Sequence, residues 1–519
     1  MDPLVLTFDV GTQSMRALLV NSRGGIEGVT SYPYPQPYLP SNVFGRAEQD
    51  PDFYYEGLCK TAKELRDSDN GEELFKRIQG VTIACIRDSV LLVDKDFKPL
   101  RNLILWLDER RASGLPNPPL WQKAAFSLVG MTETVKMLYQ NSFYNWIREN
   151  EEKLWNKSSK FIFLSGYLTF KLTGEKKDSV ANQVGHVPFD NKKRKWMDRG
   201  LSRCIADIPK DKLIDLVESA KVIGYITKET AEKSGIPEGI PMFASGTDKA
   251  SEALGLSVIG NGKAAISLGS AATIQFCSPK YFEPEPFLPS YPSIIPGYFN
   301  SEYQIYRGFW TLTWFKNEFC HAEAKKAEEN GCSAEEILDE YLKDVPPGCN
   351  GLVITPHLSP GAGNPFAKGV IEGLSDKHTK KHLYRAIIEG IDFELLMAMK
   401  RMERRSGLHV DELYIAGGGS KSDLVVQIAA DIFGKPVKRI QTHEATAIGS
   451  AMSGFVGLGV FPDYQTAAAS MSHDGKVFKP NMKRHKVYMD IFNNVYCHIE
   501  KVNTGLFKRL KRLAGVSQD

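Results

Sequence analysis

The sequence predicts an α/β protein with two similar domains. Its 519 residues include 42% hydrophobic side chains, enough to build more than one core. Apolar runs with strand character alternate with helical segments in the second half, which favours parallel strands covered by helices. A strand–turn–strand pattern at the start of the chain also recurs about 255 residues later. These two observations predict the fold class.

The recurring pattern consists of two apolar runs around a polar turn. Residues 4–8 and 17–20 flank the first turn, and residues 264–268 and 272–276 flank the second. Each pair of runs predicts two strands joined by a turn. We therefore expect an N-terminal domain over 1–250, a C-terminal domain over 251–480 and a helical tail over 481–519.

Hydrophobic spacing and turn residues predict the elements between and after these repeats. In the first half they are helices over 132–154 and 158–172 (the second ended by Gly174), an irregular segment over 178–196, and a strand over 240–245 followed by a helix from Ala250. In the second half they are a strand over 352–355, a long helix capped by Ser375 or Asp376 and ended by Gly407, a strand over 412–416, a helix ended by Gly434, a strand over 436–440 and a helix over 445–456.

Composition excludes several classes of protein. The 65 basic and 62 acidic residues argue against a nucleic-acid partner, and no apolar run is long enough to span a membrane. The eight scattered cysteines predict small buried side chains in a reducing compartment. We expect a cytoplasmic protein that binds a small molecule and has no membrane partner; a homodimer stays open. The basic segment 508–512 predicts a solvated helix end.

Three glycine-containing turns follow predicted strands, at Gly11, at Gly269 and at 417–419. Glycine lets backbone N–H groups approach an anion closely, because it lacks a Cβ. Thr12, Ser14 and Ser270 add hydroxyl groups, and Asp9 and Asp248 add carboxylates at strand ends. The chain contains no GxxxxGK[ST], GxGxxG, HExxH or GxSxG motif. Together these features favour phosphate binding without a Walker loop or a dinucleotide fold.

The segment Asp9-x-Gly11-Thr12-x-Ser14-x-Arg16 resembles the opening phosphate motif of the FGGY carbohydrate kinases, which include glycerol kinase and xylulokinase. Seven further segments resemble motifs of that family in the same order. They are Glu48-Gln49-Asp50-Pro51; Trp106-Leu107-Asp108-Glu109-Arg110; Leu172-Thr173-Gly174; Gly246-Thr247-Asp248-Lys249-Ala250; Ser267-Leu268-Gly269-Ser270; Gly308 with Trp314; and Gly417-Gly418-Gly419-Ser420 with Glu444-Ala445-Thr446.

The resemblance implies two actin-like domains of the ribonuclease H type, with ATP and a sugar in a catalytic cleft between them. It implies that Asp248 is the general base and that Asp9 orients Mg²⁺, through water. The cofactor-binding residues implied for ATP are Gly11, Thr12, Gln13, Ser14, Arg16, Gly269, Ser270, Gly417, Gly418, Gly419 and Ser420.

The substrate-binding residues implied in the same way are Arg87, Asp88, Asp108, Asp248 and Lys249. Arg87-Asp88 stands where glycerol kinases carry Arg-Glu and xylulokinases Met-His, and either hydroxyl binding or an ion pair that holds the loop would explain it. Asp108 is the stronger hydroxyl acceptor, whereas Trp106 is expected to pack. Lys249 departs from the usual Gln or Asn; beside Asp248 it would lower the pKa of that carboxyl or bind phosphate or an acidic substrate.

These residues predict ATP-dependent phosphorylation of a hydroxyl group on a small sugar or polyol, with a ketopentose as the first choice. A glycerol, polyol or sugar-acid kinase of the same family is the alternative. A different class, an ATP switch of the actin or heat-shock chaperone type, shares the doubled domain. A chaperone would need a peptide-binding domain, however, and only about 50 residues follow the last expected nucleotide-site helix.

Overall fold

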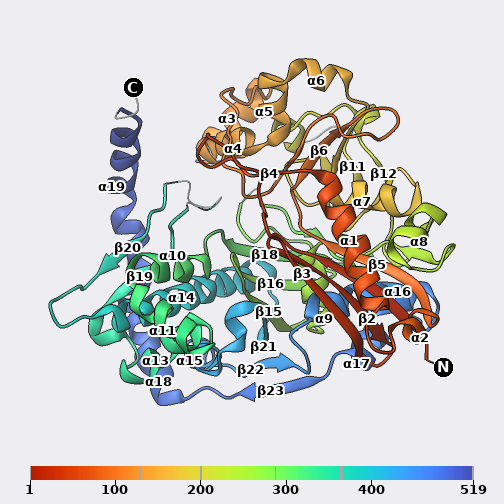
Figure 1. Ribbon diagram of the computed structural model, residues 1–519. Coiled ribbons are helices and arrows are strands. Elements are labelled where there is room, and N and C mark those ends of the chain that lie inside the picture. Colours follow the sequence, from red (N-terminus) through yellow and green to blue (C-terminus); the bar gives the residue numbers. More distant parts are fainter. Residues whose placement is uncertain are drawn as a thin grey trace. The chain divides into compact units, whose positions relative to one another are not determined.

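The computed structural model describes residues 2–128, 130–198, 201–286, 288–359, 361 and 366–516 (Figure 1). The chain forms two compact units. Unit 1 comprises Met1–Ile259, Tyr291–Asn300 and Glu444–His473; unit 2 comprises Gly260–Ser290, Ser301–His443 and Asp474–Asp519. This division differs from the expected one, because two later segments return to unit 1 and the helical tail is part of unit 2.

Unit 1 is built on a six-stranded sheet with the order β13-β14-β5-β1-β2-β3. Strands β1, β2 and β3 are antiparallel neighbours, whereas β5 lies parallel to β1 and β14 lies parallel to β5. The bounds are β1 Leu4–Val10, β2 Ser14–Asn21, β3 Ile26–Pro33, β5 Ile78–Cys85, β13 Val222–Tyr225 and β14 Pro241–Phe243. Six of the seven β1 residues are buried, as expected for a strand covered on both faces.

Unit 2 repeats this arrangement. The second sheet, whose strands β15, β16, β21, β22 and β23 belong to unit 2, has the order β17-β18-β16-β15-β21-β22-β23; β15 and β16 are antiparallel, and β21 and β22 continue parallel to β15. The bounds are β15 Gly262–Leu268, β16 Ala272–Ser278, β17 Tyr291–Pro292, β18 Phe299–Ile305, β21 Val410–Ala416, β22 Val437–Ile440 and β23 Asp474–Phe478. The order β3-β2-β1-β5-β14 thus corresponds to β18-β16-β15-β21-β22, which confirms the predicted internal repeat.

Helices cover both sheets (Figure 1). In unit 1 they are α1 Pro51–Arg66, α2 Gly71–Phe75, α3 Leu120–Leu128, α4 Thr132–Asn141, α5 Phe143–Asn150, α6 Glu152–Lys157, α7 Leu164–Thr173, α8 Lys228–Ser234, α9 Asp248–Gly255, α16 Ala445–Gly457 and α17 Tyr464–Met471. In unit 2 they are α10 Trp310–Phe319, α11 His321–Asn330, α12 Ala334–Asp339, α13 Tyr341–Asp344, α14 Lys380–Ser406, α15 Asp423–Phe433, α18 Met482–Ile491, a π-helical turn Phe492–Tyr496 and α19 Cys497–Val516.

Short strands complete the two units. A four-stranded sheet of unit 1 has the order β4-β7-β6-β8. The bounds of its strands are β4 Glu48–Gln49, β6 Val90–Val93, β7 Leu103–Ile104 and β8 Lys160–Phe163. The three two-stranded sheets are β9 Lys177–Ser179 with β12 Asp215–Val217, β10 Phe189–Asp190 with β11 Lys195–Trp196, and β19 Val353–Thr355 with β20 Val370–Glu372.

Three predicted elements are corrected. The helix expected over 132–154 is three helices, because Ser142 and Glu151 have non-helical backbone angles. The helix expected over 158–172 begins as strand β8, which pairs with β6. The long helix α14 is capped by Thr379, not by Ser375 or Asp376. The predicted ends at Gly174, Gly407 and Gly434 are confirmed, since each glycine has a positive φ of 64–77°.

Helices α9 and α16 of unit 1 touch through glycine. A Cβ on Gly255 would lie 1.8 Å from the carbonyl oxygen of Ala445, and a Cβ on Gly449 would lie 1.9 Å from the carbonyl oxygen of Ser251. No real side chain fits at those distances, so both positions require glycine. The contact fixes α9, the helix that begins at Asp248.

We predict that Gly449→Ala lowers the free energy of unfolding by about 2–4 kcal/mol, because the new methyl group forces two backbones apart. A urea titration followed by circular dichroism measures this change. Gly505→Ala in α19 is the matched control, since nothing lies within 4 Å of its Cβ position. There the better helix propensity of alanine should leave stability unchanged or slightly higher. Equal effects of the two substitutions would contradict the packing argument.

Candidate active site

Three chain segments with predicted site residues leave the sheet of unit 1 at one edge. Val10 ends β1 beside Cys85 at the end of the parallel strand β5, and the backbone N–H of Ile86 donates to the carbonyl of Val10 at 3.0 Å. Cys85 in turn forms a parallel bridge with Thr247. The turn after β1, the pair Arg87-Asp88 and the start of α9 therefore emerge side by side, the usual location of a ligand site in such sheets.

The turn after β1 is closed by a hydrogen bond from the N–H of Gly11 to the carbonyl of Ser14 at 3.0 Å. Thr12 stands half-buried at the tip, and its Oγ1 accepts a 3.0 Å hydrogen bond from the indole Nε1 of Trp106. Gln13 is exposed, and its amide donates to the hydroxyl of Tyr38 at 2.6 Å. Trp106 was expected only to pack, but it also holds the hydroxyl group of the turn after β1. We call this turn, which resembles a phosphate motif, the first phosphate-type turn.

Acidic side chains gather behind this turn. The guanidinium of Arg16 lies 2.7 Å from the carboxylate of Glu444 and 3.8 Å from that of Asp9. Burial raises the pKa of Asp9 to about 7; Arg16 opposes the shift, whereas the charges of Asp248, Glu444 and Glu252 add to it. Neither Glu252 nor Glu444 is among the predicted site residues, although Glu444 begins one of the segments that resemble the family's motifs. Two sequence features could have identified these acids: Glu252 lies four residues after Asp248, and Glu444 immediately precedes α16.

The local structure around Asp248 is a capped helix start. The hydroxyl of Thr247 accepts from the N–H of Ala250 at 3.2 Å, and Oδ1 of Asp248 accepts from the N–H of Lys249 at 2.8 Å. The ammonium of Lys249 lies 3.3 Å from the buried carboxylate of Glu252, one turn along the same helix. Lys249, the unusual neighbour of the expected base, thus has an acidic partner on α9.

The pair Arg87-Asp88 lies in a strained turn after β5. Asp88 has a φ of 50°, a conformation uncommon for a residue other than glycine. Its carboxylate lies 2.9 Å from Nδ1 of His186 and accepts from the backbone N–H of the same residue at 3.4 Å. The guanidinium of Arg87 lies 5.8 Å from the ring centre of Tyr291. His186 therefore fixes Asp88, through a contact between residues 98 positions apart that no local pattern predicts.

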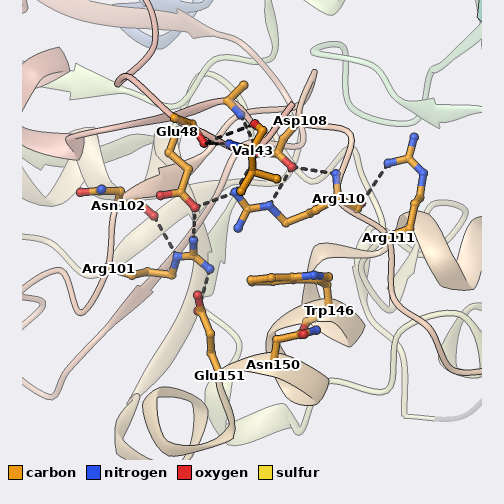
Figure 2. Close-up of polar contacts among 12 residues, drawn as sticks. Val43, Glu48, Arg101, Asn102, Asp108, Arg110, Arg111, Trp146, Asn150 and Glu151 are labelled. Carbon is orange, nitrogen blue, oxygen red and sulfur yellow. Dashed lines mark hydrogen bonds and ion pairs between the residues drawn. The ribbon is translucent and has the colours of Figure 1, made fainter. Parts of the chain in front are cut away.

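The structure gives Asp108 a different role from hydroxyl binding. Its side chain has no exposed surface, and both carboxylate oxygens accept hydrogen bonds, as Figure 2 shows. Oδ1 accepts from Nε and the backbone N–H of Arg110 at 2.7 and 2.9 Å, and Oδ2 accepts from the N–H of Ala47 at 2.6 Å. Such a carboxylate holds a loop in place.

Arg110 extends this buried network to two further segments (Figure 2). Its Nη2 donates to Glu48 at 2.6 Å; Arg101 donates to the same carboxylate at 2.5 Å and to Glu151 at 2.7 Å. The ring of Trp146 stacks 4.5 Å from the Arg110 guanidinium. Pairing of this kind compensates the desolvation of the charges. The network therefore joins the segment that starts at Glu48 to the segment that carries Trp106.

A second buried carboxylate supports the strand that leads to Asp248. Asp178 accepts hydrogen bonds from Ser165 at 2.7 Å and from the amides of Asn182 and Gln183 at 2.9 Å each, and burial raises its pKa. Ala181, within the same turn, forms a parallel bridge with Gly246. The segment expected to be an irregular loop is thus organised around Asp178 and packs beside the start of α9.

The two predicted turns of unit 2 also emerge side by side. Strands β15 and β21 are parallel with Ser267 opposite Ala416, so the turn at Gly269 and the turn at 417–420 leave the same edge of the sheet. The N–H of Gly269 donates to Ala271 at 3.1 Å, and the N–H of Trp310 donates to the carbonyl of Ser270 at 3.3 Å. The segment between Gly308 and Trp314 therefore packs on the second turn.

Glycine is required in the turn after β21 by close packing. Gly417 has a φ of 87°, and a Cβ there would lie 2.7 Å from the carbonyl carbon of Leu268; a Cβ on Gly419 would lie 2.3 Å from the ring of Phe309. Gly418 has nothing within 4 Å of its Cβ position. The hydroxyl of Ser420 is turned inward and donates to the carbonyl of Gly417 at 2.7 Å. Gly418 is thus the member of this turn with open space above its backbone.

Within the described ranges, no three His, Cys, Asp or Glu side chains are grouped as metal ligands. No helix there is long and apolar enough to cross a membrane. Each of the eight cysteines is a thiol, and five of them are buried.

We predict that Trp106 and Thr12 act as a coupled pair. Trp106→Phe keeps the ring but removes the N–H donor, and Thr12→Val keeps the shape but removes the acceptor. Each single substitution should raise KM for the nucleotide several-fold, whereas the double variant should resemble the single ones. The coupling energy from this cycle should be about 1 kcal/mol. Additive effects would show that the 3.0 Å contact contributes nothing to the site.

Comparisons with known proteins agree with this geometry. Residues 4–255 match the N-terminal domain of the FGGY family of carbohydrate kinases, and residues 264–458 match its C-terminal domain. The chain is 28% identical over 520 residues to xylulose kinase of Bacillus subtilis, covering 97% of this chain and 98% of the relative. It is 24% identical over 503 residues to gluconokinase of the same organism, covering 95% and 96%.

A solved structure shares the whole fold. The ligand-bound xylulose kinase from Lactobacillus acidophilus superposes with a TM-score of 0.81 at 20% identity, covering 98% of this chain and 100% of that one. The duplicated sheets of units 1 and 2 are accordingly the two actin-like domains that the sequence predicted. Because the two family models together cover most of its length, the chain belongs to the FGGY family of carbohydrate kinases.

Proposed function

We propose that this sugar kinase transfers the γ-phosphoryl group of ATP to a hydroxyl group of a neutral ketopentose, with Asp248 as the general base. The observation that carries the proposal is the shared edge of the unit 1 sheet, where Asp248, Arg87-Asp88 and the turn at Gly11 emerge from neighbouring strand ends. A base, hydrogen-bonding groups for a sugar and a phosphate-type turn are the parts that phosphoryl transfer requires.

In the proposed reaction the carboxylate of Asp248 accepts the proton of the attacking sugar hydroxyl. The sugar oxygen forms a bond to the γ-phosphorus as the bond from that phosphorus to the bridging oxygen of ADP breaks. Two features favour Asp248 as the base. It lies at the start of α9, and that helix is held by the glycine contact with α16.

The nucleotide would be bound by groups that each unit presents at its own sheet edge. The turn hydroxyls and N–H groups are suited to phosphate oxygens, and the open backbone at Gly418 is suited to the adenosine. The residues proposed for ATP are Gly11, Thr12, Gln13, Ser14 and Arg16 in unit 1, and Gly269, Ser270, Gly417, Gly418, Gly419 and Ser420 in unit 2.

Mg²⁺ is proposed to bind at Asp9. The fit rests on charge: Asp9 is partly buried near the carboxylates of Asp248, Glu252 and Glu444, and their charges add to the effect of burial, which is the main cause of its raised pKa. A cation would relieve the repulsion and favour the ionised carboxylate. When bound, the metal would neutralise charge on the phosphate oxygens. Arg16, between Asp9 and Glu444, would keep the carboxylates in place.

A neutral sugar suits the site better than a sugar acid. The cation beside the base, Lys249, is paired with Glu252, and Asp88 is paired with His186. Acidic groups outnumber basic ones around Asp9, so a substrate carboxylate would meet repulsion. We propose that Arg87, Asp88 and Lys249 contact sugar hydroxyls and that Asp108 acts indirectly by holding the loop. Xylulose kinases among the relatives, one of them 28% identical, support a ketopentose.

We predict that Asp248→Asn lowers kcat for sugar phosphorylation at least a thousandfold while the Kd for ATP changes less than threefold. The amide cannot accept the proton, but it keeps the shape of the carboxylate. Sugar-dependent ADP release measures the first quantity, and calorimetry measures the second. Asp215→Asn, an exposed aspartate on β12, is the control and should retain full turnover. Retained turnover in Asp248→Asn would remove Asp248 as the base.

The substrate class is tested by the same ADP-release assay with the parent enzyme. D-xylulose, D-ribulose, glycerol and D-gluconate are compared at equal concentration. The proposal expects kcat/KM to be highest for a ketopentose and at least tenfold lower for gluconate. A preference for gluconate would overturn the charge argument, and a preference for glycerol would favour the polyol alternative. Sugar-independent hydrolysis would instead indicate an ATP switch of the actin or chaperone type.

The raised pKa of Asp9 leads to a separate prediction about stability. The folded chain holds a proton on Asp9 up to about pH 7, whereas the free carboxyl loses it near pH 3.8. The fold therefore loses stability relative to the unfolded chain as the pH rises from about 4 to about 7, and the loss stays constant above 7. Without nucleotide, Asp9→Asn should be more stable than the parent by about 4 kcal/mol at pH 8 and equal to it at pH 4.

Chemical denaturation at the two pH values measures this difference, with Asp215→Asn as the control. Adding Mg²⁺ and ATP should stabilise the parent at pH 8 more than Asp9→Asn, because only the parent offers the metal a carboxylate. If both chains gained the same stability, Asp9 would not be a metal ligand. If the difference at pH 8 were absent from the start, the buried carboxyl would not be strained.

A further inference from the structure

Helix α19 carries a line of exposed aliphatic side chains. Val502, Leu506, Leu510 and Leu513 expose 73%, 54%, 54% and 61% of their surface. Their spacing of four, four and three residues matches the 3.6-residue repeat of an α-helix, so the four side chains lie on one face. Figure 1 shows α19 extending away from the sheet of unit 2. We call these four residues the α19 stripe.

Unit 2 covers the first turn of α19 and one flank of its middle. Ile499 and Phe507 are buried, and the ammonium groups of Lys508 and Lys511 lie 5.3 and 5.0 Å from the ring centre of Phe366. These contacts anchor α19 to the body of unit 2. The four stripe residues follow Ile499 along the same face, and they stay exposed where the helix extends beyond its first turn.

The polar part of α19 is strongly basic. Its ionisable residues other than histidine and cysteine are one acid, Glu500, and five bases, Lys501, Lys508, Arg509, Lys511 and Arg512. All five bases are exposed. Turning 100° per residue places Lys501, Lys508 and Arg512 opposite Leu506 and Leu510, with Arg509 at the edge of the stripe. An apolar face bordered by cations is suited to an apolar surface with negative charge at its rim.

We propose that α19 binds the surface of a membrane that contains anionic lipids, lying in the plane of the interface with its stripe in the acyl boundary. Long basic side chains would reach the lipid phosphates from the helix flanks. Charge favours this occupant over a second copy of α19, which would bring the same five cations to the contact. No described helix can cross a membrane, so the association is peripheral. The bases of 508–512 are exposed, as expected for a solvated helix end, and the proposal adds a lipid partner for them.

The test is co-sedimentation of the full-length protein with vesicles. One set is phosphatidylcholine alone, and the other contains about 30% phosphatidylserine. The proposal expects at least tenfold stronger partitioning to the anionic vesicles, and weaker binding at high salt. Leu506→Glu with Leu510→Glu should abolish binding, and Arg509→Glu with Arg512→Glu should lower it at least tenfold. ADP release by every variant should equal that of the parent, which shows that the fold is intact.

The matched control changes the same charge elsewhere in unit 2. Lys325 and Lys326 lie on the exposed face of α11. The double variant Lys325→Glu with Lys326→Glu should leave vesicle binding unchanged. An equal loss of vesicle binding in this control would show that binding depends only on the net charge of the protein, and it would overturn the proposal. Failure of the parent to bind either vesicle would also overturn it. Light scattering without lipid is the last test. If the parent is a dimer and the Leu506→Glu/Leu510→Glu variant is a monomer, a second copy covers the stripe and the proposal is overturned.

Discussion

Parallel pairing of β1 with β5 in unit 1, and of β15 with β21 in unit 2, is the constraint on which the rest of the site depends. Each first strand turns back on itself within a few residues, while its parallel neighbour arrives from a distant part of the chain. The turn and the end of the neighbour then share one edge of the sheet. Because the arrangement occurs twice, the protein has two sheet edges that each carry a turn of the kind predicted to bind phosphate.

Carboxylates of similar sequence context differ in role because their partners differ. Asp108 has both oxygens occupied by donors from Arg110 and Ala47 and has no exposed surface. Asp9 has one arginine at 3.8 Å and three acidic neighbours, so its charge is under-compensated. A compensated carboxylate stabilises a loop, whereas an under-compensated one attracts a cation. Motif position alone does not separate the two cases.

The sequence predicted the doubled strand–turn–strand, the alternating second half and the glycine ends of helices, because period and turn chemistry are local properties. It did not predict the return of Glu444–His473 to unit 1, since that depends on the fit between Gly255 and Gly449. Nor did it find the bond between Trp106 and Thr12, or the pair of Asp88 with His186. These contacts join residues 94 and 98 positions apart, and only the strand order brings them together.

The returning segment also explains why Glu444 matters although it lies far from the other acids in sequence. The chain passes from unit 2 to unit 1 between His443 and Glu444, and Glu444 is the cap residue of α16. Its carboxylate binds Arg16 on β2 at 2.7 Å. One ion pair therefore ties the start of α16 to the strand that follows the first phosphate-type turn. Because α16 in turn contacts α9 through glycine, the position of Asp248 depends on the same short segment that orders Arg16.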